Sequence, residues 1–300
     1  MQVLRPKARL IPIVPRVQRE PSLLRETMVK LAQSRTALAG MFIILLFIFG
    51  AITAPLIAPY NPVAQVISER VSHPLTPGHL LGTDDLGRDL LSRIIYGARI
   101  SLVIGIVSVG ISLLFGLLIG TLSGYFGGWF DRIVMRIIDI MLAFPYILLT
   151  IVIVAILGAS LLNAMIAIGI SQIPQYARVV RASVMAEKES DYVTAERSLG
   201  AGDTELMLRT ILPNCLAPIF VQATLGIGDA ILSSAALSFL GLGAQPPTPE
   251  WGLMIASAKD FVTSAWWIVT FPGIAILLAV LGFNLVGDTL RDALDPRMKD

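Results

Sequence analysis

Long runs without a charged residue dominate this sequence of 300 residues. Three of them extend from Thr36 to Ser68, from Ile100 to Phe130 and from Phe261 to Gly287. A further apolar run, at about 216–240, contains a single charged residue. The apolar core of a bilayer is about 30 Å thick, and about 20 apolar residues in a helix cross it. Because lipid offers the backbone no hydrogen-bond partner, such runs are expected to be helical. The pattern predicts membrane-spanning helices at about 37–57, 100–122, 216–240 and within 261–287.

The longest uncharged run has 38 residues, from Ile140 to Ala177. As a single helix it would measure about 57 Å at about 1.5 Å per residue, which is nearly two bilayers. The run is therefore expected to turn back on itself, and Gly158-Ala159-Ser160 is the segment best suited to the turn. With this hairpin the sequence predicts six spans in an all-α membrane protein.

Basic residues predict the orientation, because Lys and Arg concentrate in cytoplasmic segments. With the N-terminus inside, 18 of the 23 Lys and Arg residues are cytoplasmic and 5 are external. Both termini are therefore predicted to be cytoplasmic. The first 36 residues have no apolar core, so we expect a partly disordered tail rather than a signal peptide. The predicted organisation is a basic N-terminal tail (1–36), a first span (37–59), an external loop with an amphipathic helix (60–98), a core with five spans and a cytoplasmic loop at about 178–214 (99–289), and a C-terminal tail (290–300).

The composition agrees with a membrane location. Hydrophobic residues make up 55% of the chain and charged residues 15%, whereas soluble proteins carry about 25% charged residues. The net charge of +2 gives no reason to expect binding to nucleic acid. The single cysteine, Cys215, cannot form a disulfide within the chain and is expected to be a small buried hydrophobe.

The largest predicted cytoplasmic loop, at about 178–214, contains a short helix with an apolar face. Asp191 can cap this helix and Gly200 can end it. Tyr192, Ala195 and Leu199 then fall on one face of the helix. A short projecting helix of this kind suits insertion into a partner's groove. The alternative is an amphipathic surface helix without a partner.

The second part of the loop predicts another helix. Asp203 can cap it, and it is expected to stop at Pro213. Glu196 and Arg197 lie beside the apolar face of the first helix.

Here the sequence resembles a known family, the permeases of bacterial ABC importers. Their cytoplasmic loop reads Glu-Ala-Ala, three residues, Gly, nine residues, Ile, one residue, Leu-Pro. The matching positions of this chain are Ala195, Gly200, Leu212 and Pro213, and the departures are Thr194, Glu196 and Thr210. The resemblance implies that the helix docks on an ATPase subunit and transmits its closure to the pore.

Three further motifs resemble the dipeptide, oligopeptide and nickel permeases in particular. They are residues 81–102, which begin Leu-Gly-Thr-Asp-Asp-Leu-Gly-Arg-Asp, residues 241–252, which contain the Pro246-Pro247 pair, and residues 287–296. The resemblance covers roughly residues 37–298 and is closest to the second permease subunit of dipeptide systems. It implies the type I ABC importer permease fold in the cytoplasmic, or inner, membrane of a bacterium or archaeon.

The family resemblance also implies partners. They are a paralogous permease (or a second copy of this chain), two ATPase subunits, an extracytoplasmic substrate-binding protein, membrane lipid and a peptide substrate. No cofactor is expected in this chain, because ATP would be bound by the partner subunits. A phosphate-binding loop needs Gly-Lys-Ser/Thr, and no lysine of this sequence follows a glycine. Dipeptides, longer peptides, glutathione and nickel chelates remain alternative substrates.

Polar residues at membrane depth are candidates for the translocation path. Asp229 is the clearest, and we expect it to line the path and meet the amine of a peptide, or else to bond a neighbouring helix. Asn284 and Asn163 are weaker candidates, because such residues often bond helices to one another.

Other protein classes have less support. An intramembrane enzyme would need a catalytic constellation, but the only histidines are His73 and His79 in the predicted external loop, and no metal-binding His-Glu-x-x-His motif is present. We therefore expect no enzymatic activity and no metal site. An ion-driven secondary transporter would be expected to show internal repeats, and none is evident. Trp251, Trp266 and Trp267 are expected in an aromatic belt at the outer interface.

Overall fold

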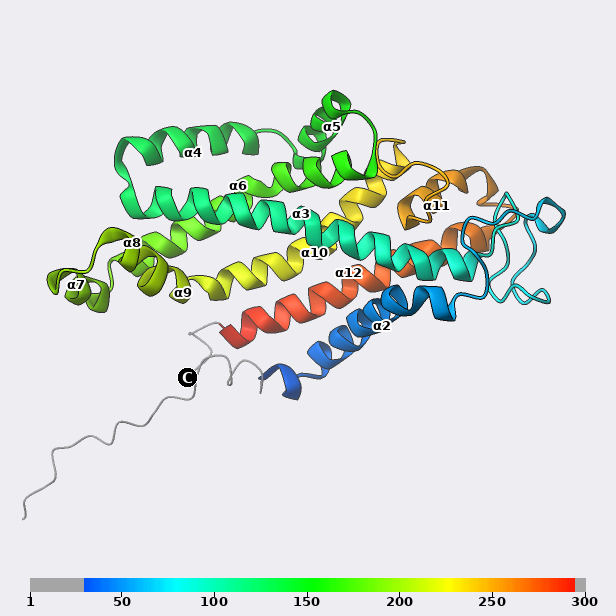
Figure 1. The fold of residues 1–300 in the computed structure, drawn as a ribbon, viewed down its shortest axis with the longest axis horizontal. Helices are drawn as coiled ribbons and strands as arrows, with labels where there is room; N and C mark the ends of the chain where they lie inside the picture. Colours follow the sequence, from blue (N-terminus) through cyan, green and yellow to red (C-terminus); the bar gives the residue numbers. More distant parts are fainter. Residues whose placement is uncertain (1–29, 295–300) are drawn as a thin grey trace, which may run out of the picture.

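The computed structural model describes residues 30–294, which form an elongated bundle of helices (Figure 1). Most of the predicted N-terminal and C-terminal tails lies outside these residues. The long helices are α2 (Arg35–Ile57), α3 (Leu90–Phe126), α6 (Leu161–Lys188), α10 (Leu216–Phe239) and α12 (Trp266–Leu294). The shorter elements are η1 (Ile67–Glu69), α4 (Gly128–Leu142), α5 (Tyr146–Leu157), α7 (Asp191–Ser198), α8 (Asp203–Glu205), η2 (Leu206–Ile211), α9 (Leu212–Asn214), α11 (Trp251–Ser257) and η3 (Lys259–Phe261).

The two ends of the bundle differ in kind. One end carries α7 and α8, and the other carries the loop of residues 58–89 together with α11 (Figure 1). We call them the α7 end and the loop end. The long helices run between the two ends, so residues far apart in sequence are brought together at each.

Small residues let the central helices α3 and α6 approach closely. A Cβ atom added to Gly116 would lie 2.4 Å from the Cβ of Tyr176, and one added to Gly120 would lie 2.6 Å from the Cβ of Val180. Small interface residues of this kind are a common basis of helix packing in membranes. α6 therefore lies directly against α3, near the centre of the bundle.

Within residues 30–294, four helices are long and apolar enough to cross a membrane: α2, α3, α10 and α12. The pair α4 and α5 would add a fifth span if it is counted as one. α6 has 28 residues, enough to cross a bilayer at about 1.5 Å per residue, but it carries the buried polar residues Ser171 and Gln172. Six spans therefore remain a prediction.

The prediction of a continuous third span from Ile140 is wrong. α4 ends at Leu142, α5 begins at Tyr146, and the two helices are bent by 93°. Pro145 explains the break, because proline lacks an N–H and disfavours helical geometry at the residue before it. The predicted turn after this segment is confirmed. Gly158 has a φ of +93°, and Ser160 caps α6 by accepting a hydrogen bond from the backbone N–H of Asn163 at 3.1 Å.

The start of the second span also differs from the prediction. The separate amphipathic helix predicted within residues 60–98 is not formed. Instead Asp89 caps α3, accepting a hydrogen bond from the N–H of Ser92 at 2.8 Å, and α3 continues without interruption for 37 residues. The boundary predicted at residues 98/99 therefore lies inside one helix.

Two of the three tryptophans expected in an aromatic belt are inside the protein. Trp251 and Trp267 are buried, whereas Trp266 is exposed. The indole N–H of Trp251 donates to the carbonyl of Ile94 at 3.0 Å, and that of Trp267 lies 3.4 Å from the carbonyl of Thr83. These bonds join α11 to the start of α3 and α12 to the loop of residues 58–89, and they close the core at the loop end.

Candidate functional site

α7 is attached to the bundle by one face and presents the other to its surroundings. Val193 is fully buried among residues that include Val184 of α6 and Leu206 of η2. Tyr192, Ala195 and Leu199 are exposed, and Leu199 is 89% exposed. The apolar face predicted from the sequence is thus formed, and it is exposed on this chain.

The limits of α7 follow the prediction closely, except that the residue predicted to cap the helix is its first residue instead. Asp191 is the first residue of the helix and Ser190 is its N-cap. Gly200 follows the last turn with a φ of +95°, a conformation that glycine adopts without strain. Asp203 is likewise the first residue of α8 rather than its cap, and its carboxylate accepts a hydrogen bond from the hydroxyl of Tyr125 at 2.5 Å.

The helical run that begins with α8 ends at Asn214, one residue past the stop predicted at Pro213. The chain continues from α8 through η2, which is a π-helical turn, into α9, where Pro213 lies in the first turn. The wider π-helical turn leaves the backbone of α9 room for a proline, which needs no N–H partner at the start of a helix. Leu212 is half-buried and Pro213 is exposed.

Polar contacts tie α7 to η2 and α9. The hydroxyl of Thr210 donates to a carboxylate oxygen of Glu196 at 2.6 Å, and the side-chain amide of Asn214 donates to the hydroxyl of Tyr192 at 3.0 Å. Tyr192 also donates to the carboxylate of Glu187. Burial, and then this bond to Glu187, raises the pKa of Tyr192. Two of the three departures from the family motif, Glu196 and Thr210, therefore contact each other.

A cleft of about 500 Å³ separates α7 from η2 at the tip of the α7 end. Charged side chains and the exposed Leu199 line it together, so both apolar and polar groups are offered to a binding partner. The lining residues are Glu196, Leu199, Gly200, Ala201, Glu205, Arg209 and Thr210.

Asp229 lies in the middle of α10 and is exposed on this single chain. Asn284 of α12 lies against the preceding residue of α10, because a Cβ atom added to Gly228 would lie 3.4 Å from the Asn284 side-chain oxygen. Asn163 is placed differently. Its amide donates to the carbonyls of Leu157 and Gly158, both at 2.9 Å, and so holds the turn between α5 and α6.

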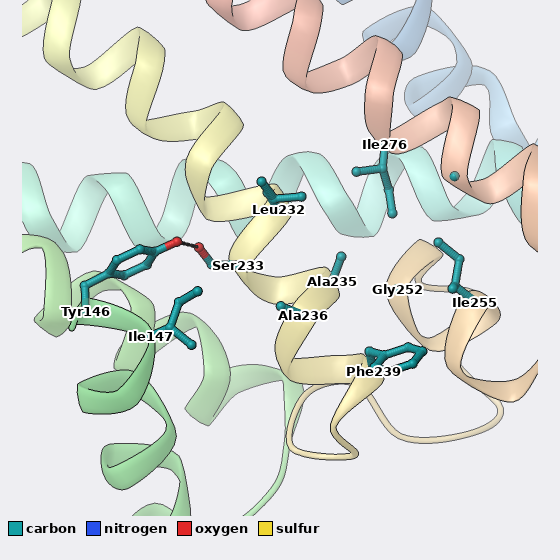
Figure 2. Close-up of a pocket in the computed structure, with 11 residues that line it drawn as sticks. Tyr146, Ile147, Leu232, Ser233, Ala235, Ala236, Phe239, Gly252, Ile255 and Ile276 are labelled. Atoms are coloured by element: carbon teal, nitrogen blue, oxygen red, sulfur yellow. Dashed lines mark hydrogen bonds between the residues drawn. The ribbon is translucent and has the colours of Figure 1, made fainter. Parts of the chain in front are cut away.

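A cavity of about 360 Å³ lies beside α10, on the loop-end side of Asp229 (Figure 2). We call it the Tyr146 cavity. Figure 2 shows side chains from α5, α10, α11 and α12 converging on it, and all but two of them are apolar. The two polar groups are the hydroxyls of Tyr146 and Ser233, which are 2.9 Å apart. The remaining lining residues are Ile147, Leu232, Ala235, Ala236, Phe239, Gly252, Ile255, Gly273 and Ile276.

The donor in this hydroxyl pair follows from its surroundings. The hydroxyl of Ser233 donates its single proton to the carbonyl of Asp229 at 2.6 Å. Tyr146 must therefore donate to Ser233. The polar edge of the Tyr146 cavity is thus hydrogen-bonded to the backbone of the residue at the centre of α10.

A second, larger cavity of about 620 Å³ lies on the other side of Asp229, towards the α7 end. We call it the Arg291 cavity. Gln222 and Leu225 of α10 line it together with Arg291 of α12. Residues 222, 225, 229, 232, 236 and 239 follow helical spacing, so one face of α10 borders both cavities, with Asp229 between them.

Sequence reasoning identified Asp229 and Asn284 but missed Tyr146, Ser233 and Arg291. One signal was available for Ser233, because it follows Asp229 by four residues and so shares its face. Tyr146 carried no such signal. It comes from a different helix, and the 93° bend between α4 and α5 precedes it.

Charged side chains also gather at the loop end, where they are buried. Asp84 accepts hydrogen bonds from the N–H groups of Leu86 and Arg88 and from the guanidinium of Arg88 at 2.6 Å. Arg93 donates to the carbonyl of Pro62 at 2.9 Å and lies 3.5 Å from Asp84. These contacts fix the loop of residues 58–89 onto the first turn of α3.

His79 lies in the same region, between two carboxylates. Its Nδ1 is 2.9 Å from Asp89 and its Nε2 is 3.2 Å from Glu69. Burial opposes a charge on the imidazole, but the hydrogen bonds to Asp89 and Glu69 outweigh it and raise the pKa of His79 above its ordinary value. Both ring nitrogens face acceptors, so the arrangement favours the doubly protonated ring.

Comparison with known proteins identifies the family. Residues 116–300 match the family described as binding-protein-dependent transport system inner membrane component. Residues 22–77 match the N-terminal TM domain of oligopeptide transport permease C. The first of these matches covers more than half of the chain and includes α7, both cavities and Asp229.

Curated relatives extend over nearly the whole chain. The di/tripeptide transport system permease protein DppC of Pseudomonas aeruginosa is 53% identical over 285 residues, which cover 93% of this chain and 94% of that protein. The dipeptide transport system permease protein DppC of Escherichia coli K12 is 54% identical over 272 residues, 89% of this chain and 91% of that protein.

A solved structure shares the fold. An inward facing conformation of the MetNI methionine ABC transporter matches with a TM-score of 0.56 and 20% identity, covering 68% of this chain and 97% of that one. The chain is an all-helical membrane protein with the type I ABC importer permease fold, and, as the motif around Gly200 predicts, it belongs to the family of binding-protein-dependent transport system inner membrane components.

Proposed function

We propose that this chain is a permease subunit of an ATP-driven importer that carries dipeptides or short peptides across the cytoplasmic membrane. The observation that carries the proposal is 53% identity over 93% of the chain to a di/tripeptide transport permease. The exposed apolar face of α7 supports it, because such a face suits a partner's groove. Glutathione, nickel chelates and longer peptides are the alternative substrates.

The proposed topology has six spans, with α4 and α5 together forming the third and α6 the fourth. The α7 end and both termini are then cytoplasmic, and the loop end faces outwards. This orientation is supported by the 18 basic residues that it places inside, against 5 outside. The cell is a bacterium or archaeon, and the protein is a multi-pass component of its cytoplasmic, or inner, membrane.

The proposed partners follow from this topology. Two ATPase subunits bind at the α7 end, and α7 of this chain docks on one of them through Tyr192, Ala195 and Leu199. The ends of the docking segment are held by Gly200, Leu212 and Pro213. The hydrogen bond between Glu196 and Thr210 stabilises the segment. An extracytoplasmic binding protein delivers substrate to the loop end, and a paralogous permease completes the pore. The chain itself hydrolyses no ATP.

The proposed translocation path runs along the exposed face of α10. Asp229 would meet the ammonium group of a peptide, and Asn284 would offer it a hydrogen bond. An unpaired charge facing lipid at this depth is costly, so the exposure of Asp229 on the single chain supports a position facing the pore or the partner permease. An Asp229→Asn variant should assemble normally and transport peptides more slowly. Transport at the wild-type rate would remove Asp229 from the path.

The experiment that tests the function is reconstitution of the complete transporter in liposomes with its binding protein. Uptake of a labelled dipeptide should require ATP on the α7 side and should persist when ionophores abolish the proton and sodium gradients. Uptake driven by an ion gradient without ATP would instead indicate a secondary transporter. Deletion of residues 191–200 should release the ATPase, and unchanged co-purification would contradict the role of α7.

A further inference from the structure

The Tyr146 cavity has the size and chemistry of a ligand site. Its volume of about 360 Å³ lies at the lower end of the range of about 300–1,000 Å³ for small-molecule pockets, which are mostly apolar with a few placed polar groups. Here the only polar side chains are Tyr146 and Ser233, and their hydroxyls are bonded to each other. The rest of the wall is aliphatic or aromatic and suits an apolar group.

Asp229 lies one helical turn from this cavity. Ser233 follows Asp229 by four residues, which corresponds to about 6 Å along the helix axis. Ser233 is also bonded to the carbonyl of Asp229 at 2.6 Å. The N-terminal residue of a peptide carries an ammonium group and a side chain close to each other. A carboxylate and an apolar cavity at this spacing match these two groups.

The geometry points to a substrate site in which Asp229 binds the peptide ammonium while the Tyr146 cavity receives the apolar side chain of the N-terminal residue. This inference rests on the proposed peptide import and makes this chain, beside the binding protein, a determinant of selectivity. The side chain of the second residue lies outside the cavity. The site therefore distinguishes two peptides of identical composition but opposite sequence.

The test uses the complete transporter in liposomes with three probes: leucyl-glycine, glycyl-leucine and glycyl-glycine. Ala236 is half-buried in the cavity wall, and Ala236→Leu fills the space that the peptide side chain needs. Uptake of leucyl-glycine should fall about tenfold, as when a pocket no longer accommodates its group. Uptake of glycyl-leucine and glycyl-glycine should stay within about twofold of the wild type.

A matched control makes the same Ala→Leu substitution at a position outside the cavity. Ala155→Leu changes an exposed position of α5 that does not line the cavity, and it should leave all three rates unchanged. Asp229→Asn should slow all three peptides to a similar degree, because each has the same ammonium group. If Ala236→Leu does not fold, Ile276→Ala enlarges the cavity and should favour tryptophyl-glycine over leucyl-glycine relative to the wild type.

Several outcomes would overturn the inference. Equal losses for leucyl-glycine and glycyl-leucine, or no loss for either, would show that the cavity does not read the N-terminal side chain. Release of the partner permease by Ala236→Leu would show that a partner side chain occupies the cavity. If the wild-type transporter imports none of the three peptides, the proposed function fails instead.

Discussion

The two ends of this permease use charged side chains in opposite ways. At the loop end, Asp84, Arg88 and Arg93 are each no more than 5% exposed, and the chain itself supplies their partners. At the α7 end, the ion pair between Glu205 and Arg209 is exposed. A buried charge must be satisfied within the protein, because its desolvation is otherwise uncompensated. Buried charges therefore fix one conformation of the loop end, whereas the charged side chains at the α7 end stay exposed and can contact a partner.

The apolar residues at the two ends show the same contrast. Trp251 and Trp267 close the core at the loop end, whereas Leu199 projects from α7 with 89% of its surface exposed. α7 is anchored by the single buried residue Val193 and a few polar contacts. A segment with few buried contacts opens at little cost in free energy, which suits the proposed docking of α7 on a partner.

The largest effect is expected from Asp84→Ala. Removing this carboxylate leaves the buried Arg93 without an acidic partner and Arg88 with only the more distant Asp85, which should cost about 3–5 kcal/mol of stability. Unfolding of the purified chain in detergent, followed by tryptophan fluorescence, measures the loss. Asp85→Ala is the matched control, because Asp85 is more exposed and its oxygen is 3.7 Å from Arg88. It should cost less than about 1 kcal/mol, and equal losses for the two variants would contradict the contrast between them.

The pH dependence of stability should also originate at the loop end. The folded-state pKa of His79 is raised, so its contribution is complete below the unfolded value of about 6.5 and is lost as the pH rises through the folded pKa. His79→Gln should cost about 1.5–3 kcal/mol at pH 6, the worth of hydrogen bonds to charged groups. The variant should cost less at pH 9 than at pH 6. An identical cost at both values would show that His79 is neutral in the folded protein.

At the α7 end, Leu199→Asp should leave stability unchanged and weaken binding of the ATPase. An exposed side chain contributes little to folding, with effects of about 0.5 kcal/mol or less, but an apolar anchor in an interface contributes about 2 kcal/mol, or roughly 30-fold in affinity. Titration of the purified ATPase into detergent-solubilised permease measures this. Leu75→Asp makes the same change at an exposed position of the loop end and should not alter ATPase affinity.

The smallest effect is expected from Thr210→Val. It removes the hydroxyl that donates to Glu196 at 2.6 Å, which should cost about 0.5–1.5 kcal/mol. Because this bond joins α7 to η2, the loss should appear as faster hydrogen exchange within α7 and not in α3. Thr204→Val, at an exposed position of α8, is the control and should change neither quantity. Faster exchange throughout the protein would show that the bond supports the whole fold.

The sequence predicted the features that depend on neighbouring residues along the chain. Its long apolar runs predicted the helices α2, α10 and α12, and Gly158-Ala159-Ser160 predicted the turn before α6. The helix from Asp191 and its end at Gly200 were also predicted. These features follow from local hydropathy, capping and backbone conformation, which short stretches of sequence specify.

The tertiary structure decided which residues meet. The bend before Tyr146 sets α5 against α10, and only this arrangement makes the Tyr146 cavity and the hydroxyl pair with Ser233. The tertiary structure likewise brings Glu196 into contact with Thr210. In the sequence these two residues are independent departures from the loop motif of the ABC importer permeases. Sequence by itself indicated that this chain is a membrane permease, and it predicted a docking helix and a carboxylate in mid-membrane. The structure decided what surrounds that carboxylate, because cavities and buried ion pairs arise from packing between helices that are distant in sequence.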